Sequence, residues 1–157
     1  MSIDEKLVSL GITIPIPTSP KGNYVSVVTV GNGTLLHLCG HLPRNISDDS
    51  LVIGKVGKDL TIEEGYASAR LCAIQILGTL KQELGGNLER VIRIVKVVGF
   101  VNCTDDFIQI PAVINGASDL FAQVFGEKGK HARSAVGSCS LPFGVATEVE
   151  CIVEVSL

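Results

Sequence analysis

The residues with the most evident chemistry lie near the end of the chain, in the stretch from His131 to Glu154. Arg133 precedes the break Leu141-Pro142-Phe143-Gly144, and the carboxylates Glu148 and Glu150 follow it. A guanidinium is a planar fork that binds a carboxylate through two hydrogen bonds, and a glutamate can move a proton at a reacting centre. The pattern therefore indicates either a site for a small carboxylic acid or an ordinary ion pair between neighbouring strands.

The elements that would position these residues read as a hairpin. Its first arm is expected from Ala132 to Ser140, and its second arm, rich in β-branched residues, from Val145 to Val155. Because side chains alternate along a strand, Glu148 and Glu150 share one face with Ile152 and Glu154, and that face cannot be plain core. Counting back from the turn places Arg133 near the level of residues 149–152 on the facing arm.

The remaining chain shows a clear order of elements. Residues 4–11 predict a short helix at the rim, residues 24–30 and 34–39 a first hairpin around Gly31-Asn32-Gly33, and residues 51–57 a weaker strand. A capping box at Thr61 and Glu64 opens a helix that runs to Leu84, and residues 91–101 predict a central strand. Residues 107–125 predict a second helix capped by Asp105 or Asp106, in which Pro111 indicates a late start or a break.

This order predicts a single α+β domain over residues 1–157, a mixed sheet with two helices packed on one face. The opposite face of the sheet needs a cover, because the chain is 46% hydrophobic and only 18% charged. Self-association through that face is the economical solution.

Composition excludes several classes of function. No run of 18 uncharged apolar residues occurs and the first residues lack the features of a secretory signal, so we expect a cytoplasmic protein without a membrane. The net charge is −3 and the sequence contains no cluster of Lys and Arg residues. Both observations argue against a nucleic-acid partner. Five dispersed cysteines and three histidines show no metal-binding spacing, so we expect reduced thiols and no metal.

Several motifs together resemble the YjgF/Rid family, also labelled reactive intermediate deaminases or L-PSP endoribonuclease-like proteins. They are Ala132-Arg133-Ser134-Ala135-Val136, the spaced Leu141-Pro142 and Glu148-Val149-Glu150, Tyr24 seven residues before Gly31, Cys39-Gly40-His41-Leu42-Pro43, and the helix opening Thr61-Ile62-Glu63-Glu64. The resemblance covers most of the chain. It implies a chorismate-mutase-like fold in a homotrimer with three clefts between subunits.

The resemblance also implies an activity without a cofactor, the hydrolysis of 2-enamine or 2-imine acids to 2-oxo acids and ammonia. Arg133 matches the arginine that holds the substrate carboxylate, and Glu148 matches the acid that positions or activates water. Gly40 matches a backbone contact to the substrate and Tyr24 a wall of the cleft. Asn115 corresponds to the cleft asparagine with a different spacing to Arg133.

Two departures bear on this expectation. Ala135 stands where many deaminating members carry a cysteine, and Cys39, another substrate-binding candidate, stands where a serine is usual. Two alternatives therefore stay open: a binding or regulatory trimer that holds small 2-oxo or 2-imino carboxylic acids without turnover, and a weak endoribonuclease. His41 and His131 form no triad, and their expected role is structural.

Overall fold

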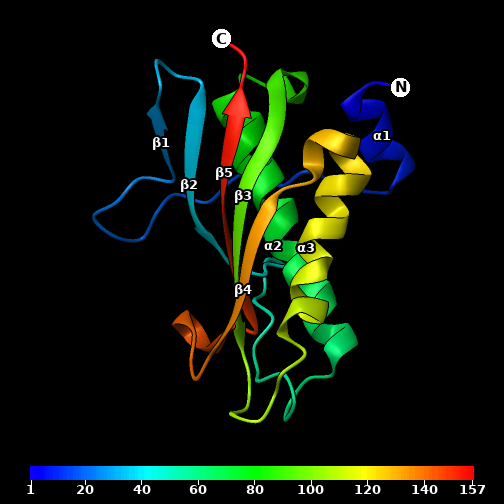
Figure 1. Cartoon of the computed structure of the whole chain (residues 1–157), viewed down its shortest axis with the longest axis vertical. Coiled ribbons are helices and arrows are strands. Elements are labelled where there is room, and N and C mark those ends of the chain that lie inside the picture. Colours follow the sequence, from blue (N-terminus) through cyan, green and yellow to red (C-terminus); the bar gives the residue numbers. More distant parts are fainter.

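The computed structural model describes residues 1–157, whose five strands form one sheet with helices packed against it (Figure 1). In chain order the main elements are α1 (Ile3–Ser9), β1 (Val27–Val30), β2 (Leu35–His41), α2 (Ile62–Glu83), β3 (Val91–Asn102), α3 (Ile110–Phe125), β4 (Ala132–Ser138) and β5 (Thr147–Val155). The strand order is β1-β2-β5-β3-β4, and only β3 and β4 run parallel. The fold is therefore the expected α+β mixed sheet.

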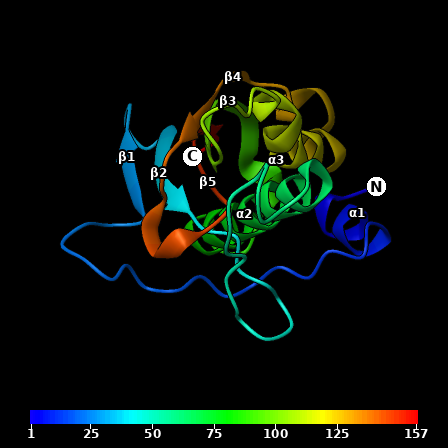
Figure 2. The same cartoon turned by 90° about the horizontal axis from the view of Figure 1, so that it is seen from below.

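Helices α2 and α3 lie side by side on one face of this sheet, as the view from below shows (Figure 2). The capping box at the start of α2 is confirmed, since Thr61 Oγ1 accepts from the Glu64 amide at 3.1 Å and Glu64 Oε2 accepts from the Thr61 amide at 2.7 Å. The first hairpin and the central strand are also confirmed, as β1–β2 and β3. No helix combines the length and the apolar character needed to cross a bilayer.

Two local predictions were wrong. Residues 51–57 form isolated bridges, Ile53 with Val145 and Val56 with Cys103, instead of a strand. The second helix begins at Ile110 without a side-chain cap, so neither Asp105 nor Asp106 caps it. Pro111 lies in its first turn, where a proline needs no amide partner, and this explains the late start.

The predicted final hairpin was also wrong, because β4 and β5 are not neighbours. Helix α3 connects β3 to β4 as a crossover, so β4 pairs parallel to one edge of β3, with Val97 beside Arg133. Strand β5 pairs antiparallel to the other edge of β3 and also to β2. Residues 139–146 carry the chain past the end of β3, so Arg133 and Glu148 stand two strands apart.

The two predicted faces of the last strand are confirmed. The residues of β5 that are buried beneath the helices are Thr147, Val149, Cys151, Val153 and Val155. Glu148, Glu150, Ile152 and Glu154 alternate with them on the opposite, helix-free face, which we call the open face. Strand register places Val28, Val30 and Val136 there too, and each is at least 43% exposed. The open face is therefore apolar as well as acidic.

A glycine sets the distance between α3 and the sheet. A Cβ on Gly99 of β3 would lie 2.6 Å from two carbons of Ile114, so any larger residue would push α3 away. Gly99 pairs with Ala135 of β4, two residues from Arg133. The close approach brings Asn115, next to Ile114 on α3, within reach of the arginine.

Candidate functional site

Arg133 projects from the edge strand β4 toward α3, and three groups of that helix hold its guanidinium. Nη1 donates to Asn115 Oδ1 at 2.8 Å and to Ser118 Oγ at 3.1 Å, while Nη2 donates to the Pro111 carbonyl at 3.4 Å. Nε makes no hydrogen bond in the chain, and Nη2 makes only this one long hydrogen bond, which leaves Nε and one N–H of Nη2 without a partner. These two donors form the edge of a guanidinium that binds a carboxylate bidentately. The residue is only half-buried, so this edge is accessible.

A histidine supports Arg133 through Ser118. The His131 ring lies 2.6 Å from the Gly129 carbonyl through Nδ1 and 2.9 Å from Ser118 Oγ through Nε2. Because a carbonyl can only accept, Nδ1 carries the proton, and Nε2 accepts from the Ser118 hydroxyl. Burial lowers the pKa of His131, and the charge of Arg133 lowers it further, so the ring stays neutral. This chain of hydrogen bonds leaves the Ser118 oxygen free to accept from Arg133.

Glu148 lies on the open face, against the backbone of Gly40 in β2. A Cβ on Gly40 would lie 2.9 Å from Glu148 Cδ and closer still to Oε1, so the carboxyl group occupies the place of a side chain there. Burial raises the pKa of Glu148, and the neighbouring charge of Glu150 raises it further. A carboxyl group with a raised pKa is a stronger proton acceptor than an ordinary one when ionised, which suits a group that must take up a proton and return it.

Next to Gly40 lies a cavity of about 460 Å³ that Tyr24, Cys39 and Gly40 help to line. Residues 17–26, the end of β2 and α2 form its walls, and Pro15 packs on Gly78 where the extended segment crosses α2. Its other polar lining residues are Thr18, Ser19, Lys21, Ser26, His41, Arg44, Asp49, Gln75 and Thr79. The volume lies within the range of about 300 to 1,000 Å³ that is typical of ligand pockets.

Cys39 and His41 take neutral forms in this wall. Burial raises the pKa of Cys39, and the charges of Glu148 and Glu150 add to the effect, so the thiol stays protonated and is a poor nucleophile. Burial lowers the pKa of His41, whose Nδ1 donates to the Cys39 carbonyl at 2.7 Å and whose Nε2 lies 2.8 Å from Thr79 Oγ1. His41 thus joins the end of β2 to α2, in keeping with a structural role.

The structure divides the candidate residues into two groups. Arg133 and Asn115 form one group, and Tyr24, Cys39, Gly40 and Glu148 form the other. Arg133 stands beside Val97, which in turn stands beside Cys151, and both neighbours are buried under the helices. Glu148 points to the open face, two strand spacings or about 10 Å away. A small acid therefore cannot touch Arg133 and Glu148 of the same chain.

The alternative of an ion pair between Arg133 and the glutamates of β5 was wrong for the same reason. Strand β3 separates them, and Arg133 takes its partners from α3. None of the four ion pairs of the chain includes Arg133 or Glu148. No three His, Cys, Asp or Glu side chains cluster in a way that could hold a metal ion.

Sequence reasoning missed most of the residues that line the cavity, among them Arg44 and Phe143. Both come from loops, where no periodic pattern distinguishes a lining residue from a solvated one. The left-handed backbone of Phe143, with φ of 58°, and its 69% exposure are visible only in the structure. The sequence signal for Arg44 was its place directly after the Gly40-His41-Leu42-Pro43 motif.

Comparisons with known proteins agree with the motifs. A family model described as "YjgF/chorismate mutase-like, putative endoribonuclease" matches residues 4–155. Protein TCP17 of Trypanosoma cruzi is 46% identical over 148 residues, which cover 94% of this chain and 90% of that protein. The protein Atu1372 from Agrobacterium tumefaciens, described as of unknown function, has a crystal structure that matches this one with a TM-score of 0.89 and a sequence identity of 41%. The match covers 98% of this chain and 92% of the Atu1372 chain. A Shewanella oneidensis structure with the same endoribonuclease designation is 31% identical with a TM-score of 0.92, covering 99% and 100% of the two chains.

Proposed function

The chain belongs to the YjgF/chorismate mutase-like family, and we propose that it hydrolyses reactive 2-imine and 2-enamine acids to 2-oxo acids and ammonia. The observation that carries the proposal is the pair of complementary half-sites. One presents a free guanidinium edge at Arg133, and the other presents a carboxyl group of raised pKa at Glu148 beside a cavity. Each half-site lacks what the other supplies.

The reaction needs a substrate anchor and a group that moves protons. Arg133 binds the substrate carboxylate through its Nε and Nη2 edge, while Asn115 and Ser118 fix the guanidinium from the other side. Ionised Glu148 accepts a proton from water as the water oxygen bonds to the carbon of the protonated imine, whose C=N π electrons move to nitrogen and give a neutral carbinolamine. Glu148 then gives that proton to the nitrogen, the C–N bond breaks to release ammonia, and the hydroxyl proton passes to the Glu148 carboxylate as the 2-oxo group forms.

The half-sites require two subunits, since one chain holds them on opposite faces of its sheet. We propose a homotrimer packed through the open face, with a cleft at each interface that joins Arg133 of one subunit to Glu148 of the next. The exposed valines of the open face support this proposal, because a helix-free apolar sheet face is costly in water. The unpaired outer edge of β4 carries Arg133 to the boundary of the subunit.

Mixing two inactive variants tests both parts of the proposal. Arg133→Ala and Glu148→Gln are each expected to lose activity toward 2-iminobutanoate generated in a coupled assay, measured as 2-oxobutanoate release in the presence of EDTA. When the two proteins are unfolded and refolded together, about a quarter of the interfaces combine an intact Arg133 with an intact Glu148. The mixture should therefore recover about a quarter of the wild-type activity.

In the control mixture, one of the two single variants is replaced by a protein that carries both substitutions. It should recover no activity, since every interface then lacks at least one intact half-site. Failure of the first mixture to recover activity, when the wild-type protein refolds with full activity, would show that the two residues do not meet across an interface. Binding of 2-oxobutanoate by the wild type without any turnover would instead favour a carboxylate-binding trimer. The net charge of −3 does not favour ribonuclease activity, because nucleic-acid binding depends on positive charge.

A further inference from the structure

A second arginine, Arg44, lines the cavity that Gly40 also lines. The side chain of Arg44 is only 21% exposed, and its Nη1 donates to the Asp49 carbonyl at 2.7 Å and to Asp49 Oδ2 at 3.0 Å. Both N–H groups of Nη1 are thereby used, whereas Nε and Nη2 make no hydrogen bond in the chain. Arg44 therefore keeps free the same bidentate edge that Arg133 keeps free.

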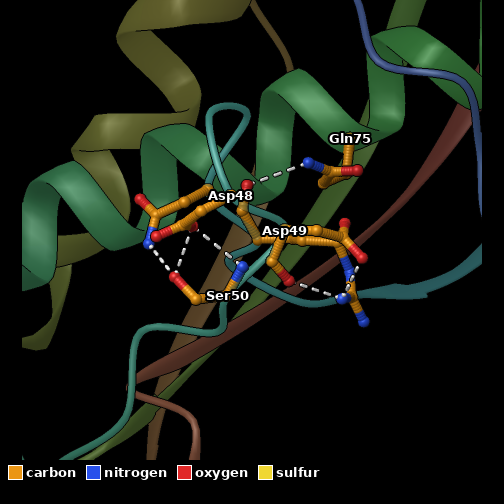
Figure 3. Close-up of polar contacts among 6 residues, drawn as sticks. Asp48, Asp49, Ser50 and Gln75 are labelled. Atoms are coloured by element: carbon orange, nitrogen blue, oxygen red, sulfur yellow. Dashed lines mark hydrogen bonds and ion pairs between the residues drawn. The ribbon is translucent and has the colours of Figure 1, made fainter.

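Besides the bonds of the Arg44 side chain to Asp49, several other contacts fix the loop that carries it (Figure 3). Gln75 of α2 donates to the Arg44 carbonyl at 3.0 Å, and Asn45 donates to Ser50 Oγ at 2.9 Å. Ser50 in turn donates to Asp48 Oδ1 from its hydroxyl at 2.6 Å and from its amide at 3.0 Å, and these bonds lower the pKa of Asp48. The guanidinium is therefore held by a loop that is already ordered, as in preorganised binding sites.

The charged residues that line the cavity include two cations. They are Lys21 and Arg44, with the anion Asp49, and His41 is neutral; the carboxylates of Glu148 and Glu150 lie nearer the Cys39 and Gly40 wall. Asp49 orients Arg44 without blocking its free edge. Arg44 follows Gly40 by four residues, so their Cα atoms lie at most about 14 Å apart, and the cavity is larger than a four-carbon acid requires.

We infer that Arg44 binds a second carboxylate of the substrate, so that the preferred substrates are imino or enamino dicarboxylic acids. This inference rests on the proposed function for the first carboxylate, which Arg133 binds at the reacting end. A planar carboxylate matches the single free edge of Arg44. The carbon chain between the two carboxylates would lie along the wall formed by Tyr24 and Gly40.

Calorimetric titration with product analogues tests the inference without turnover. The probes are 2-oxoglutarate, its 5-methyl ester, which has nearly the same size but no second charge, and 2-oxobutanoate. Wild-type protein should bind 2-oxoglutarate about 10- to 100-fold more tightly than the ester. Arg44→Met should remove this preference and leave the affinity for 2-oxobutanoate unchanged. Arg70 lies outside the cavity and donates a hydrogen bond to Gln123, so Arg70→Met is the matched control and should keep the preference for 2-oxoglutarate over its ester.

The outcomes separate this inference from the proposed function. Equal affinity of the wild type for 2-oxoglutarate and its ester would overturn the role of Arg44, even if Arg44→Met fails to fold. If Arg44→Met lowered the affinity for all three ligands equally, the inference would be overturned as well. Turnover of 2-iminobutanoate by the wild-type protein would in that case still support the deaminase proposal. Arg44→Lys keeps the charge but loses the planar edge, so it should retain only part of the preference. An intact dicarboxylate preference in a protein without turnover would support Arg44 and refute the deaminase proposal.

Discussion

The contact between Gly40 and Glu148 makes the position of the carboxyl group testable separately from its presence. Gly40 has no left-handed backbone, so Gly40→Ala adds no backbone strain. Its new methyl group would lie 2.9 Å from Glu148 Cδ and 3.1 Å from Cγ, whereas carbon atoms in contact prefer about 3.5 to 4.0 Å. The carboxyl end of Glu148 must therefore move by roughly 1 Å. A flexible side-chain end can make such a movement with little cost to the fold.

A displacement of about 1 Å at a catalytic group can lower the rate by about 100-fold. We therefore expect Gly40→Ala to lower kcat toward 2-iminobutanoate by about 10- to 100-fold, with a melting temperature within a few degrees of wild type. Glu148→Gln should lower kcat by about 10²- to 10⁴-fold, the usual range for a lost general acid or base. Rates come from the coupled assay and stability from differential scanning calorimetry.

A double-mutant cycle decides whether Gly40 acts through Glu148. In the Glu148→Gln background the carboxylate is already gone, so adding Gly40→Ala should lower kcat by less than about threefold. If the methyl group lowered the rate as much in that background as in the wild type, it would act directly on the substrate. A Gly40→Ala variant with the wild-type kcat would refute the proposal that the rate depends on the position of the Glu148 carboxyl group.

Two further predictions follow from the pKa shifts. Because the charge of Glu148 adds to the effect of burial on the pKa of Cys39, Glu148→Gln should speed iodoacetamide labelling of Cys39 at pH 8, quantified by peptide mass spectrometry; an unchanged rate would contradict this coupling. His41 and His131 have lowered pKa values in the fold, so the unfolded chain binds more protons near their ordinary value of about 6.5. Their contribution to stability is full above about pH 7 and is lost as the pH falls, so between pH 7.5 and 5.5 the urea midpoint of the wild type should change more unfavourably than that of His131→Asn.

The sequence predicted those elements whose signals are local. The Thr61–Glu64 capping box and the apolar stripe determine where α2 begins and which side it buries, and the alternation in β5 determines which side carries Glu148. These patterns depend on neighbours within a few residues, so they can be read without knowing the rest of the fold.

The position of β4 could not be read in the same way. A Pro-Phe-Gly segment between two strand-like stretches is typical of a hairpin. In the structure, however, the crossover through α3 places β4 beside β3, and the two strands pair in parallel. The decision is made by long-range pairing, since β5, with alternate residues fully buried, gains more from a central place than the small and exposed residues of β4. The cavity, with Arg44 and Phe143, depends on that arrangement and was equally out of reach.

The separation of Arg133 from Glu148 ties the proposed activity to assembly, and one substitution outside both half-sites can test that link. Val136 lies on the open face of β4, 44% exposed, in the same row of the sheet as Phe100 and Glu148. Val136→Asp would bury a charge in the proposed interface but leave it in water in a monomer. We therefore expect a folded monomer by sedimentation and circular dichroism, with activity toward 2-iminobutanoate lost.

Val136→Thr, which keeps the shape and adds no charge, is the matched control and should keep both assembly and activity. A folded Val136→Asp monomer with wild-type activity would mean that one chain brings its own anchor and acid together, against the geometry of its sheet. A Val136→Asp protein that remains a trimer would show that the open face is not the interface. Both results bear on the same physical point: a sheet separates what lies on its two faces, so a site that needs both faces needs a second copy of the chain.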